Sequence, residues 1–458
     1  MCDASINDAL PPPRRKVVPG MCIKCKVTKP SISIRRTLYC KDCFVKASIV
    51  KFRAALTKSR KRVELPQIKV LVALSGGAAS SAMLKLTTDF INMERRGTDA
   101  EPPFTGVVIG HVDESCLFPG SQEDEIRAIA AESGLPYFKV ALEDVFAPGE
   151  GQLGLLELVK ASIAPGAARD QFCARLVEPA KTDSQADQLK ALFAGLTSAT
   201  DKEDMLDIVK TALIMRLARK LECGAVLLGD SATRTAVKVM ALTGHGRGLS
   251  LPLEAGTESK WFHGVVVVRP MRDYVVKEIA FFNRWTRQRA AFVPTFTTGG
   301  PRRASIGRLA EAFIVELDRD FPSTVPTVCR TLQKLEPRAE ALAARPCVVC
   351  GMPAELDAHA WRSRLTISNA QDTEQLPVPV EASAPDLLDI TSCLCYSCQN
   401  MLHHTTPGTV LPRFCTTQLQ NAVDSTASAN NHNDLRAKIE EFLIDDSDGS
   451  DSEHNQMQ

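Results

Sequence analysis

The fold is decided by the stretch Val70-Leu71-Val72-Ala73-Leu74-Ser75-Gly76-Gly77-Ala78-Ala79-Ser80-Ser81. Its apolar first half ends at a serine and two glycines, and a helical pattern with Met83, Leu86 and Phe90 on one face follows. This change of period is typical of a buried parallel strand that turns into a helix through a short loop. Glycines let the backbone approach an anion closely, and the first helical turn offers unpaired N–H donors. The stretch therefore predicts a cradle of phosphate size at the end of a strand.

The loop is too short for a Walker A motif and lacks its lysine, and it lacks the third glycine of a dinucleotide fingerprint. It resembles the PP-loop of ATP-pyrophosphatases, whose usual form is Ser-Gly-Gly-Lys-Asp-Ser. The lysine and aspartate positions of that form hold Ala78 and Ala79 here. The resemblance implies that the backbone shape of the anion-binding loop is kept, whereas its two charged side chains are absent.

Strands and helices alternate after residue 68. Short apolar runs at 68–74, 105–112, 136–140, 225–228 and 265–268 predict strands, and patterns at 122–133, 205–221 and 232–243 predict helices. Such alternation predicts an α/β fold, a parallel sheet with helices on both faces. Ligands of these sheets bind at the carboxyl ends of the strands. The expected degenerate nucleotide-binding loop there comprises Ser75, Gly76, Gly77, Ser80, Asp113 and Asp230, although the two acids and Glu114 could equally serve only to cap strand ends.

Bulk composition sets the class of protein. A chain of 458 residues with 24% charged and 44% hydrophobic residues is expected to form two or three globular units at ~150 residues each. No apolar run approaches the roughly 20 residues that span a bilayer. The first residues are acidic where a signal peptide needs basic ones. Eight of the 15 cysteines fall in CxxC pairs, which favours metal sites in a reducing compartment over disulfides.

Two sets of CxxC pairs predict two structural zinc sites, because four thiolates complete a closed tetrahedral shell. Fourteen residues separate the N-terminal pairs, and forty-four separate the C-terminal pairs. Lone CxxC pairs can instead be incidental or redox-active, and Cys393, His359, His403 and His404 are competing ligands near the second set. The expected metal ligands are Cys22, Cys25, Cys40 and Cys43 in the first site and Cys347, Cys350, Cys395 and Cys398 in the second.

Charge is distributed unevenly along the chain. From Arg14 to Arg62 there are sixteen lysines and arginines against one acid, Asp42, whereas residues 445–453 carry five acids and no base. Residues 44–62 predict a basic amphipathic helix, which is either a solvated face or a surface that follows phosphates. The basic head therefore favours nucleic acid as a partner.

Composition also suggests domain boundaries. Residues 145–200 lack a strong period, and we expect an insertion or a mobile loop above the sheet. Residues 436–444 predict a short terminal helix. We expect a flexible leader at 1–20, the N-terminal zinc module and basic helix at 21–64, the degenerate PP-loop α/β domain at 65–290, a helical segment at 291–345, the C-terminal zinc module with an inserted loop at 346–444, and an acidic disordered tail at 445–458.

In order and spacing these features resemble the cytoplasmic tRNA 2-thiolation protein 2 family over nearly the whole chain. The resemblance is carried by the N-terminal cysteine pairs, residues 74–81, 111–114, 227–234 (Leu-Leu-Gly-Asp-Ser-Ala-Thr-Arg), 246–252 (Gly-Arg-Gly-Leu-Ser-Leu-Pro), 269–273 (Arg-Pro-Met-Arg-Asp) and 394–398 (Leu-Cys-Tyr-Ser-Cys). It implies a subunit that acts in the cytoplasm with a catalytic PP-loop homologue to thiolate the wobble uridine of tRNA Lys, Glu and Gln. It also implies sulfur from a thiocarboxylated ubiquitin-related modifier. Our hypothesis for the tRNA contacts names Arg53, Lys58, Arg60, Lys61, Arg62, Arg247, Arg302 and Arg303.

The catalytic homologue family looks like an enzyme that adenylates the uridine and then delivers sulfur. It carries the loop lysine and aspartate, a central CxxC pair and a Gly-His-Asn-x-x-Asp segment. This chain has Ala78 and Ala79, no cysteine in residues 196–207, and Gly-Asp-Ser-Ala-Thr-Arg at 229–234. Adenylation needs cationic or metal-coordinating groups, and sulfur transfer needs a reactive thiolate. We therefore expect no catalytic residue, and the missing charges make ATP binding by the loop doubtful.

Two other functions stay open at this point. One is an autonomous ATP-dependent tRNA-modifying enzyme with a non-standard loop, in which Cys173 would be the candidate thiol. The other is a zinc-scaffold interaction protein without an RNA role. Cys223 precedes an apolar strand and is expected to be a core residue.

Overall fold

The computed structural model describes residues 20–34, 37–63, 68–94, 104–120, 122–147, 154–179, 183–262, 264–355 and 388–440. The expected leader (except residue 20), His359, most of the inserted loop and the acidic tail lie outside the described residues. Side chains of the last helix are described as far as residue 426.

A six-stranded sheet in the order β5-β4-β3-β6-β8-β7 forms the centre of the molecule. Its strands are β3 (Lys69–Ala73), β4 (Gly106–Asp113), β5 (Tyr137–Ala141), β6 (Ala225–Leu227), β7 (Glu258–Ser259) and β8 (Val266–Val268). The five expected strands are confirmed and run parallel to their neighbours. The sixth strand, β7, has only two residues, pairs antiparallel with β8 and was not predicted from the sequence.

Alternate residues of the strands enter two separate cores. Leu71, Val108 and Val226 are in register and point to one face, where they join one buried cluster. Their neighbours Val70 and Val72 point to the other face and join a second cluster. Burial on both faces explains why these strands are continuously apolar in sequence.

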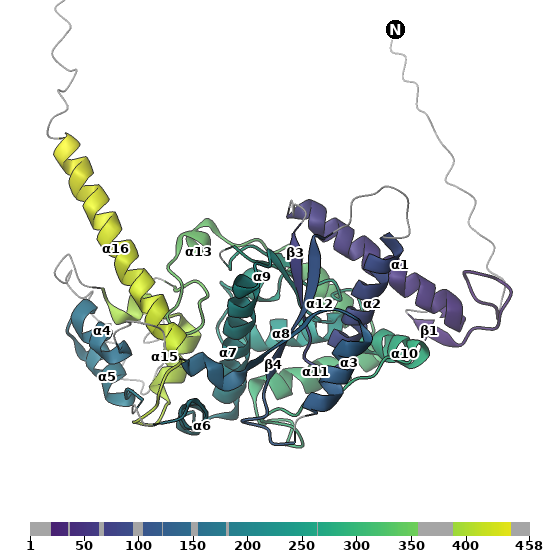
Figure 1. The fold of residues 1–458 in the computed structure, drawn as a ribbon, viewed down its shortest axis with the longest axis horizontal. Coiled ribbons are helices and arrows are strands. Elements are labelled where there is room, and N and C mark those ends of the chain that lie inside the picture. The colour runs from purple at the N-terminus through teal and green to yellow at the C-terminus, as the bar shows by residue number, and fades with distance from the viewer. Residues whose placement is uncertain are drawn as a thin grey trace, which may run out of the picture.

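Helices cover both faces, as the alternation of elements predicts (Figure 1). The second cluster is closed by α1 (Lys41–Arg62), α2 (Ala78–Glu94), α3 (Glu123–Glu132) and α10 (Val276–Thr286). The first cluster is closed mainly by α7 (Ala199–Lys220), which begins where the Ser198 side chain accepts a hydrogen bond from the Asp201 N–H. The expected helical face of Met83, Leu86 and Phe90 is buried.

A smaller helical layer packs around α8 (Ala232–Gly244). Ser231 caps this helix by accepting a hydrogen bond from the Arg234 N–H, and Ser305 caps α11 (Ile306–Asp320) through the Arg308 N–H. α9 (Leu251–Ala255) and α12 (Thr324–Leu332) complete this layer, and α13 (Ala339–Ala343) follows α12 in the chain. α8, α11 and α12 share one buried cluster.

Of the two expectations for residues 145–200, the mobile loop is wrong for most of the described part of that segment. It contains the end of η1 (Leu142–Phe146) and the helices α4 (Leu155–Ser162), α5 (Ala167–Arg175) and α6 (Gln185–Gly195). Leu158, Phe172 and Leu192 are buried in the same cluster as one face of the sheet. Each helix is too short to show a clear period, and tertiary burial decides its conformation.

The N-terminal part forms a hairpin of β1 (Ile32–Ile34) and β2 (Thr37–Tyr39) that leads into α1. The predicted basic helix is confirmed and begins slightly earlier, at Lys41. Phe52 and Leu56 are each 1% exposed, and the Tyr274 hydroxyl donates to the Ser48 carbonyl at 2.5 Å. α1 is therefore held against α10 and α2 along one face.

The C-terminal part contains η3 (Ile390–Cys393), α15 (Tyr396–His403) and α16 (Arg413–Glu440). The short helix expected from residue 436 is thus the end of a helix that begins at residue 413. Cys347, Cys393, Cys395 and Cys398 belong to the same buried cluster as Leu71 of the central strand. The C-terminal part therefore shares a core with the sheet.

Candidate functional site

The glycine loop joins β3 to α2 in the manner that its sequence predicts. Gly76 has φ +82°, a left-handed conformation, and a Cβ there would lie 2.6 Å from Ile126 Cγ1. The Gly76 carbonyl accepts hydrogen bonds from the Ala291 N–H at 2.8 Å and from the Ser81 hydroxyl at 3.2 Å. Position 76 therefore requires glycine, both for its backbone angle and for the space around it.

The serines of the loop meet at its mouth. The Ser75 and Ser80 hydroxyl oxygens are 3.1 Å apart, and the Ser80 hydroxyl also donates to the Gly77 carbonyl at 3.0 Å. A Cβ on Gly229, in the loop after β6, would lie 2.9 Å from Ser80 Cα. Ser75 and Ala78 are exposed, so the mouth opens to solvent. The structure thus brings together Ser75, Gly76, Gly77 and Ser80 as expected.

The acids at the strand ends are held in ion pairs. Asp113 ends β4 and accepts hydrogen bonds from Lys139 Nζ at 2.8 Å and the Ser115 N–H at 3.0 Å. Burial alone would raise the pKa of Asp113, but these contacts outweigh it and the pKa lies below its usual value. Glu114 pairs with Lys210 at 2.5 Å.

Asp230 is held in the same way at the end of β6. Its carboxylate accepts from Arg269 Nε at 3.0 Å. Burial would raise the pKa of Asp230, but Lys238, Arg269 and Arg234 together lower it. Neighbouring cations of the same chain therefore neutralise the acids on both sides of the loop, which matches the alternative that these acids stabilise strand ends.

His111, a histidine within the apolar strand β4, was not predicted from the sequence as a residue of this site. Its Nδ1 lies 2.8 Å from the Leu74 carbonyl oxygen, and its Nε2 lies 3.2 Å from Glu123 Oε2. The ring therefore links the last carbonyl before the loop to the first turn of α3. A polar residue in an otherwise buried strand was the signal that could have revealed it.

The N-terminal cluster is the group Cys22, Cys25, Cys40 and Cys43, whose sulfur atoms all lie within 4.8 Å of one another. Cys25 Sγ and Cys40 Sγ are 3.9 Å apart. Hydrogen bonds from the backbone at Val27 and Thr28 lower the pKa of Cys25 to about 6, which favours a thiolate. The cluster follows directly from the expected CxxC pairs.

The C-terminal cluster is the group Cys347, Cys350, Cys395 and Cys398, which meets the same distance limit. Cys350 Sγ and Cys395 Sγ are 3.6 Å apart. Cys393 lies outside the group, and burial raises its pKa to about 11, so it stays a neutral thiol. His403 and His404 also lie outside the group.

Both clusters have the geometry of a tetrahedral metal site. Metal–sulfur bonds of about 2.3 Å place tetrahedral sulfur atoms about 3.8 Å apart, close to the separations in both clusters. A disulfide would require about 2.05 Å instead. Within the described ranges these two clusters are the groups of side chains that could hold a metal ion.

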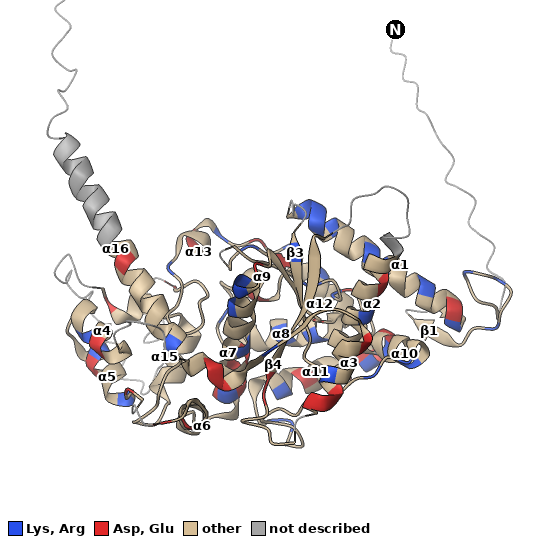
Figure 2. Cartoon of the chain, viewed as in Figure 1, with Lys and Arg blue, Asp and Glu red and all other residues tan. Residues whose placement is uncertain are grey.

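The basic residues named in the sequence analysis do not form a single surface (Figure 2). Arg53, Lys58 and Lys61 lie on the exposed side of α1, and we call these three residues the basic face. Arg60 is half-buried over the Phe104 ring at 5.6 Å, and Arg62 pairs with Glu258 at 3.1 Å.

The other three arginines lie elsewhere. Arg302 and Arg303 are exposed in the turn before α11, and Arg302 pairs with Glu316. Arg247 is buried between Asp204 and Glu254. A buried, paired arginine offers no charge to an RNA phosphate, so the expectation that Arg247 contacts tRNA is withdrawn.

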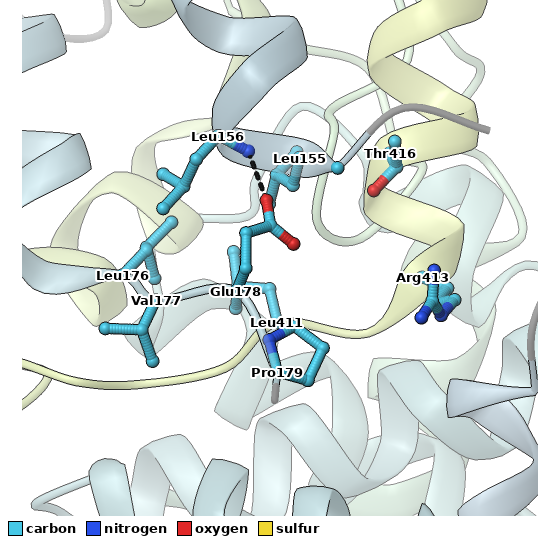
Figure 3. A pocket seen from close by; sticks show the side chains of 10 residues that line it. Leu155, Leu156, Leu176, Val177, Glu178, Pro179, Leu411, Arg413 and Thr416 are labelled. Carbon is cyan, nitrogen blue, oxygen red and sulfur yellow. Dashed lines mark hydrogen bonds between the residues drawn. The ribbon is translucent and has the colours of Figure 1, made fainter. Parts of the chain in front are cut away.

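A small, partly open pocket of about 20 Å³ lies between α4 and the start of α16 (Figure 3). The Glu178 carboxylate reaches into it and accepts from the Leu156 N–H at 2.6 Å, which caps α4. This volume fits about one water molecule. The pocket therefore has no room for a nucleotide and lies apart from the glycine loop.

The central sheet and its glycine loop define a PP-loop α/β protein of the ATP-pyrophosphatase class, with a four-cysteine cluster toward each end of the chain. A family model described as cytoplasmic tRNA 2-thiolation protein 2 matches residues 305–400. Proteins of that name are 36% identical in Bos taurus, over 76% of this chain and 74% of the relative, and 34% identical in Homo sapiens, over 81% and 79%. The chain belongs to the cytoplasmic tRNA 2-thiolation protein 2 family.

A comparison with solved structures finds similarity to the U34-tRNA thiolase NcsA from Methanococcus maripaludis with its 4Fe-4S cluster. It is 16% identical, with a TM-score of 0.47 and coverage of 77% of this chain and 99% of that one. An NMN synthetase from Francisella tularensis is 8% identical, with a TM-score of 0.30 and coverage of 65% and 98%. Across the described part of the chain, no helix has both the length and the apolar character needed to cross a membrane.

The two loop glycines make a matched pair for mutation. Gly76→Ala introduces a left-handed alanine whose Cβ meets Ile126, so we expect a loss of about 2–4 kcal/mol of unfolding free energy. At Gly77 the nearest atom to a Cβ is Ser75 Oγ at 3.7 Å, and Gly77→Ala should cost under about 1 kcal/mol. Urea denaturation of both variants measures the difference, and equal stabilities would contradict this account of the loop.

Proposed function

We propose that this chain is the non-catalytic subunit of a tRNA thiolation complex. In this proposal it forms a heterodimer with a catalytic PP-loop homologue in the cytoplasm. The pair makes the 2-thio group of 5-methoxycarbonylmethyl-2-thiouridine at position 34 of tRNA Lys, Glu and Gln. Sulfur comes from a thiocarboxylated ubiquitin-related modifier that the catalytic subunit uses.

The observation that carries the proposal is a loop with intact geometry and no charged chemistry. Gly76, Gly77 and the Ser75–Ser80 contact keep the cradle, yet its exposed mouth carries Ala78. The acids nearby are paired with Lys139, Lys210 and Arg269. Backbone N–H groups can bind an anion, but adenylation also requires positive charge around the triphosphate.

The thiols of the α/β part also support a non-catalytic role. Cys116 follows β4 near the carboxyl edge of the sheet, where burial and then Glu143 raise its pKa. Burial also raises the pKa of Cys173, the other candidate thiol. Since the thiolate is the nucleophile, raised pKa values make both cysteines poor carriers of sulfur at neutral pH.

Zinc in both four-cysteine clusters is part of the proposal, because four thiolates and no open position suit a structural zinc ion. Elemental analysis should find two zinc ions per chain. Cys25→Ser and Cys350→Ser should each lower this number to one, since a lost ligand opens the tetrahedral shell.

Cys223→Ala is the matched control for zinc content. Cys223 is 3% exposed and lies outside both clusters, so this variant should keep two ions. Less than one zinc ion per chain in well-folded wild-type protein would contradict the assignment.

tRNA binding is proposed to use the basic face on α1. This face has a fixed direction, because Ser59 on the opposite side of the helix donates to Glu258 at 2.6 Å, and Lys51 at the margin of the basic face pairs with Glu278 at 3.0 Å. Lys58→Glu with Lys61→Glu should weaken tRNA binding about tenfold or more. The slope of log affinity against log salt should fall by about one per lost phosphate contact.

The control for this experiment is Lys160→Glu with Lys190→Glu. These exposed lysines lie on α4 and α6, away from α1, and their reversal changes the net charge equally. Filter binding with several tRNA species at three salt concentrations separates the two double variants. If both double variants lower the tRNA affinity equally, the net charge of the protein and not the basic face determines binding. If neither lowers it, the basic face is only a solvated surface.

The catalytic part of the proposal predicts that the purified chain thiolates no tRNA when it is given Mg-ATP, tRNA and a sulfur donor. Ala78→Lys with Ala79→Asp should not create activity, because the loop would regain charge without a reactive thiol. Cells that lack the chain should lose wobble-uridine thiolation, which mass spectrometry of tRNA nucleosides measures.

The alternatives give different outcomes in these assays. Thiolated tRNA from the wild-type chain alone would establish the autonomous enzyme instead. Normal thiolation in cells that lack the chain, together with negligible tRNA affinity, would favour a scaffold without an RNA role.

A further inference from the structure

The N-terminal module and α1 expose lysines whose charge no carboxylate of the described residues neutralises. The ion pairs that hold α1 in place use Lys51 and Arg62 instead. From the first cluster cysteine to the end of α1 the sequence has one acid, Asp42. Six exposed lysines without an ion-pair partner among the described residues make up what we call the lysine surface: Lys24, Lys26, Lys29, Lys46, Lys58 and Lys61.

Along α1 these lysines share one outer strip with small side chains. The strip follows exposed positions at helical spacing: Lys46, Val50, Thr57 and Lys61. Its side of the helix is opposite to Phe52, which is 1% exposed. From Lys46 to Lys61 the strip is about 22 Å long, at the helical rise of 1.5 Å per residue. A shallow, open groove of about 440 Å³ follows it between Val50 and Lys61.

The N-terminal cluster lies on the same side of α1 as this strip. Cys43, a member of the cluster, lies in the first turn of the helix, seven residues before Val50. Positions seven apart share one side of a helix, so the Cys43 thiol holds the cluster at the beginning of the strip.

The other cysteine pair of the cluster brings further lysines to this end. Its turn is closed by the Lys26 N–H, which donates to the Cys22 carbonyl at 2.8 Å, and by the Cys22 N–H, which donates to the Thr28 carbonyl at 3.0 Å. Lys24 lies inside the turn and Lys29 follows it, and both are exposed. Lysines and arginines therefore continue from α1 into the module beyond its start (Figure 2).

The side chains of this surface suit double-helical RNA better than unpaired RNA. Proteins that bind single strands stack the bases on exposed aromatic rings. Here the rings pack inside the protein, since Phe44 and Phe52 are buried and Tyr39 lies edge-on to Phe44 with centroids 6.4 Å apart. A straight row of cations separated by small side chains matches the regular phosphates beside the wide, shallow minor groove of an A-form helix.

An anionic membrane is the other polyanion that a basic helix could bind. A helix that lies in a membrane surface needs a broad apolar face for the lipid. The apolar face of α1 is already buried against α10 and α2. The observations therefore favour RNA.

We propose that the lysine surface binds a double-helical arm of tRNA, with the N-terminal module and α1 as the two ends of one contact. This inference rests on the proposed tRNA binding, and it adds the module as a second contact and names the part of tRNA that is held. The N-terminal cluster then has a role beyond folding, because it fixes the lysines of the module in line with those of α1. Holding an arm leaves the anticodon loop, which contains position 34, accessible to the catalytic partner.

The first experiment compares three RNAs by fluorescence anisotropy at one salt concentration. They are whole tRNA, a hairpin with the stem of one tRNA arm, and an unpaired strand as long as that hairpin. The wild-type chain should bind the hairpin about tenfold or more tighter than the unpaired strand, because the unpaired strand finds no aromatic ring on which to stack.

The second experiment tests the module. Lys24→Glu with Lys29→Glu should lower the hairpin affinity about tenfold, and the slope of log affinity against log salt should fall by about one per lost phosphate contact. Elemental analysis should find the wild-type zinc content in this variant. Lys160→Glu with Lys190→Glu is the matched control, because it changes the net charge equally at exposed positions of α4 and α6. If the glutamates lower the zinc content, Lys24→Gln with Lys29→Gln decides instead.

Four results would contradict these expectations in different ways. Equal affinity for the hairpin and the unpaired strand, or affinity for whole tRNA alone, would overturn the inference. Wild-type hairpin affinity in the Lys24 and Lys29 variants would overturn it too, since the module would then lie outside the contact. Tighter binding to vesicles of phosphatidylserine and phosphatidylcholine than to the hairpin would replace tRNA by a membrane surface. If the wild-type chain binds none of the RNAs, the proposed tRNA binding itself is rejected, and thiolation in cells tests the wider function independently.

Discussion

The rest of the molecule depends on one left-handed residue at the end of a doubly buried strand. β3 hydrogen-bonds to β4 on one side and to β6 on the other, so its direction is fixed by two neighbours. At Gly76 the chain reverses into α2 in a space that Ile126 and Ala291 already fill. No other residue type fits this turn without displacing those side chains. The position of α2, and with it the core on that face, follows from this turn.

In the proposed non-catalytic subunit, the same site keeps the backbone shape of a PP-loop without its charged side chains. A turn of this shape stabilises the sheet whether or not a nucleotide binds there. Charged groups at the strand ends are free to pair with one another once no phosphate or metal competes for them, and Asp113–Lys139 and Asp230–Arg269 are such pairs. The turn thus gives a physical reason for glycine at position 76 in a loop that carries Ala78 in place of the PP-loop lysine.

Some sequence patterns predicted the structure correctly, and others did not. β-branched runs and CxxC pairs are dense, local signals, and the expected strands and both four-cysteine clusters were confirmed. The helices α4, α5 and α6 were missed because each is stabilised by burial against residues distant in sequence, which no local pattern shows. Arg247 was misplaced for a similar reason, since a single arginine in a sequence carries no information on whether it will be buried. The role of His111 could not be predicted either, because its contact with the Leu74 carbonyl exists only once β3 and β4 have paired.

Both edges of the sheet are protected against pairing with other chains. One edge is β7, whose two residues offer few free backbone groups, and Glu258 on it is bound by Ser59, Arg62 and Arg272. The other edge is β5, where Lys139 carries a charge in mid-strand. Short edges and edge lysines are features by which natural sheets avoid strand addition and aggregation. Because parallel strands pair slowly in general, this protection of both edges would act while the sheet is still assembling.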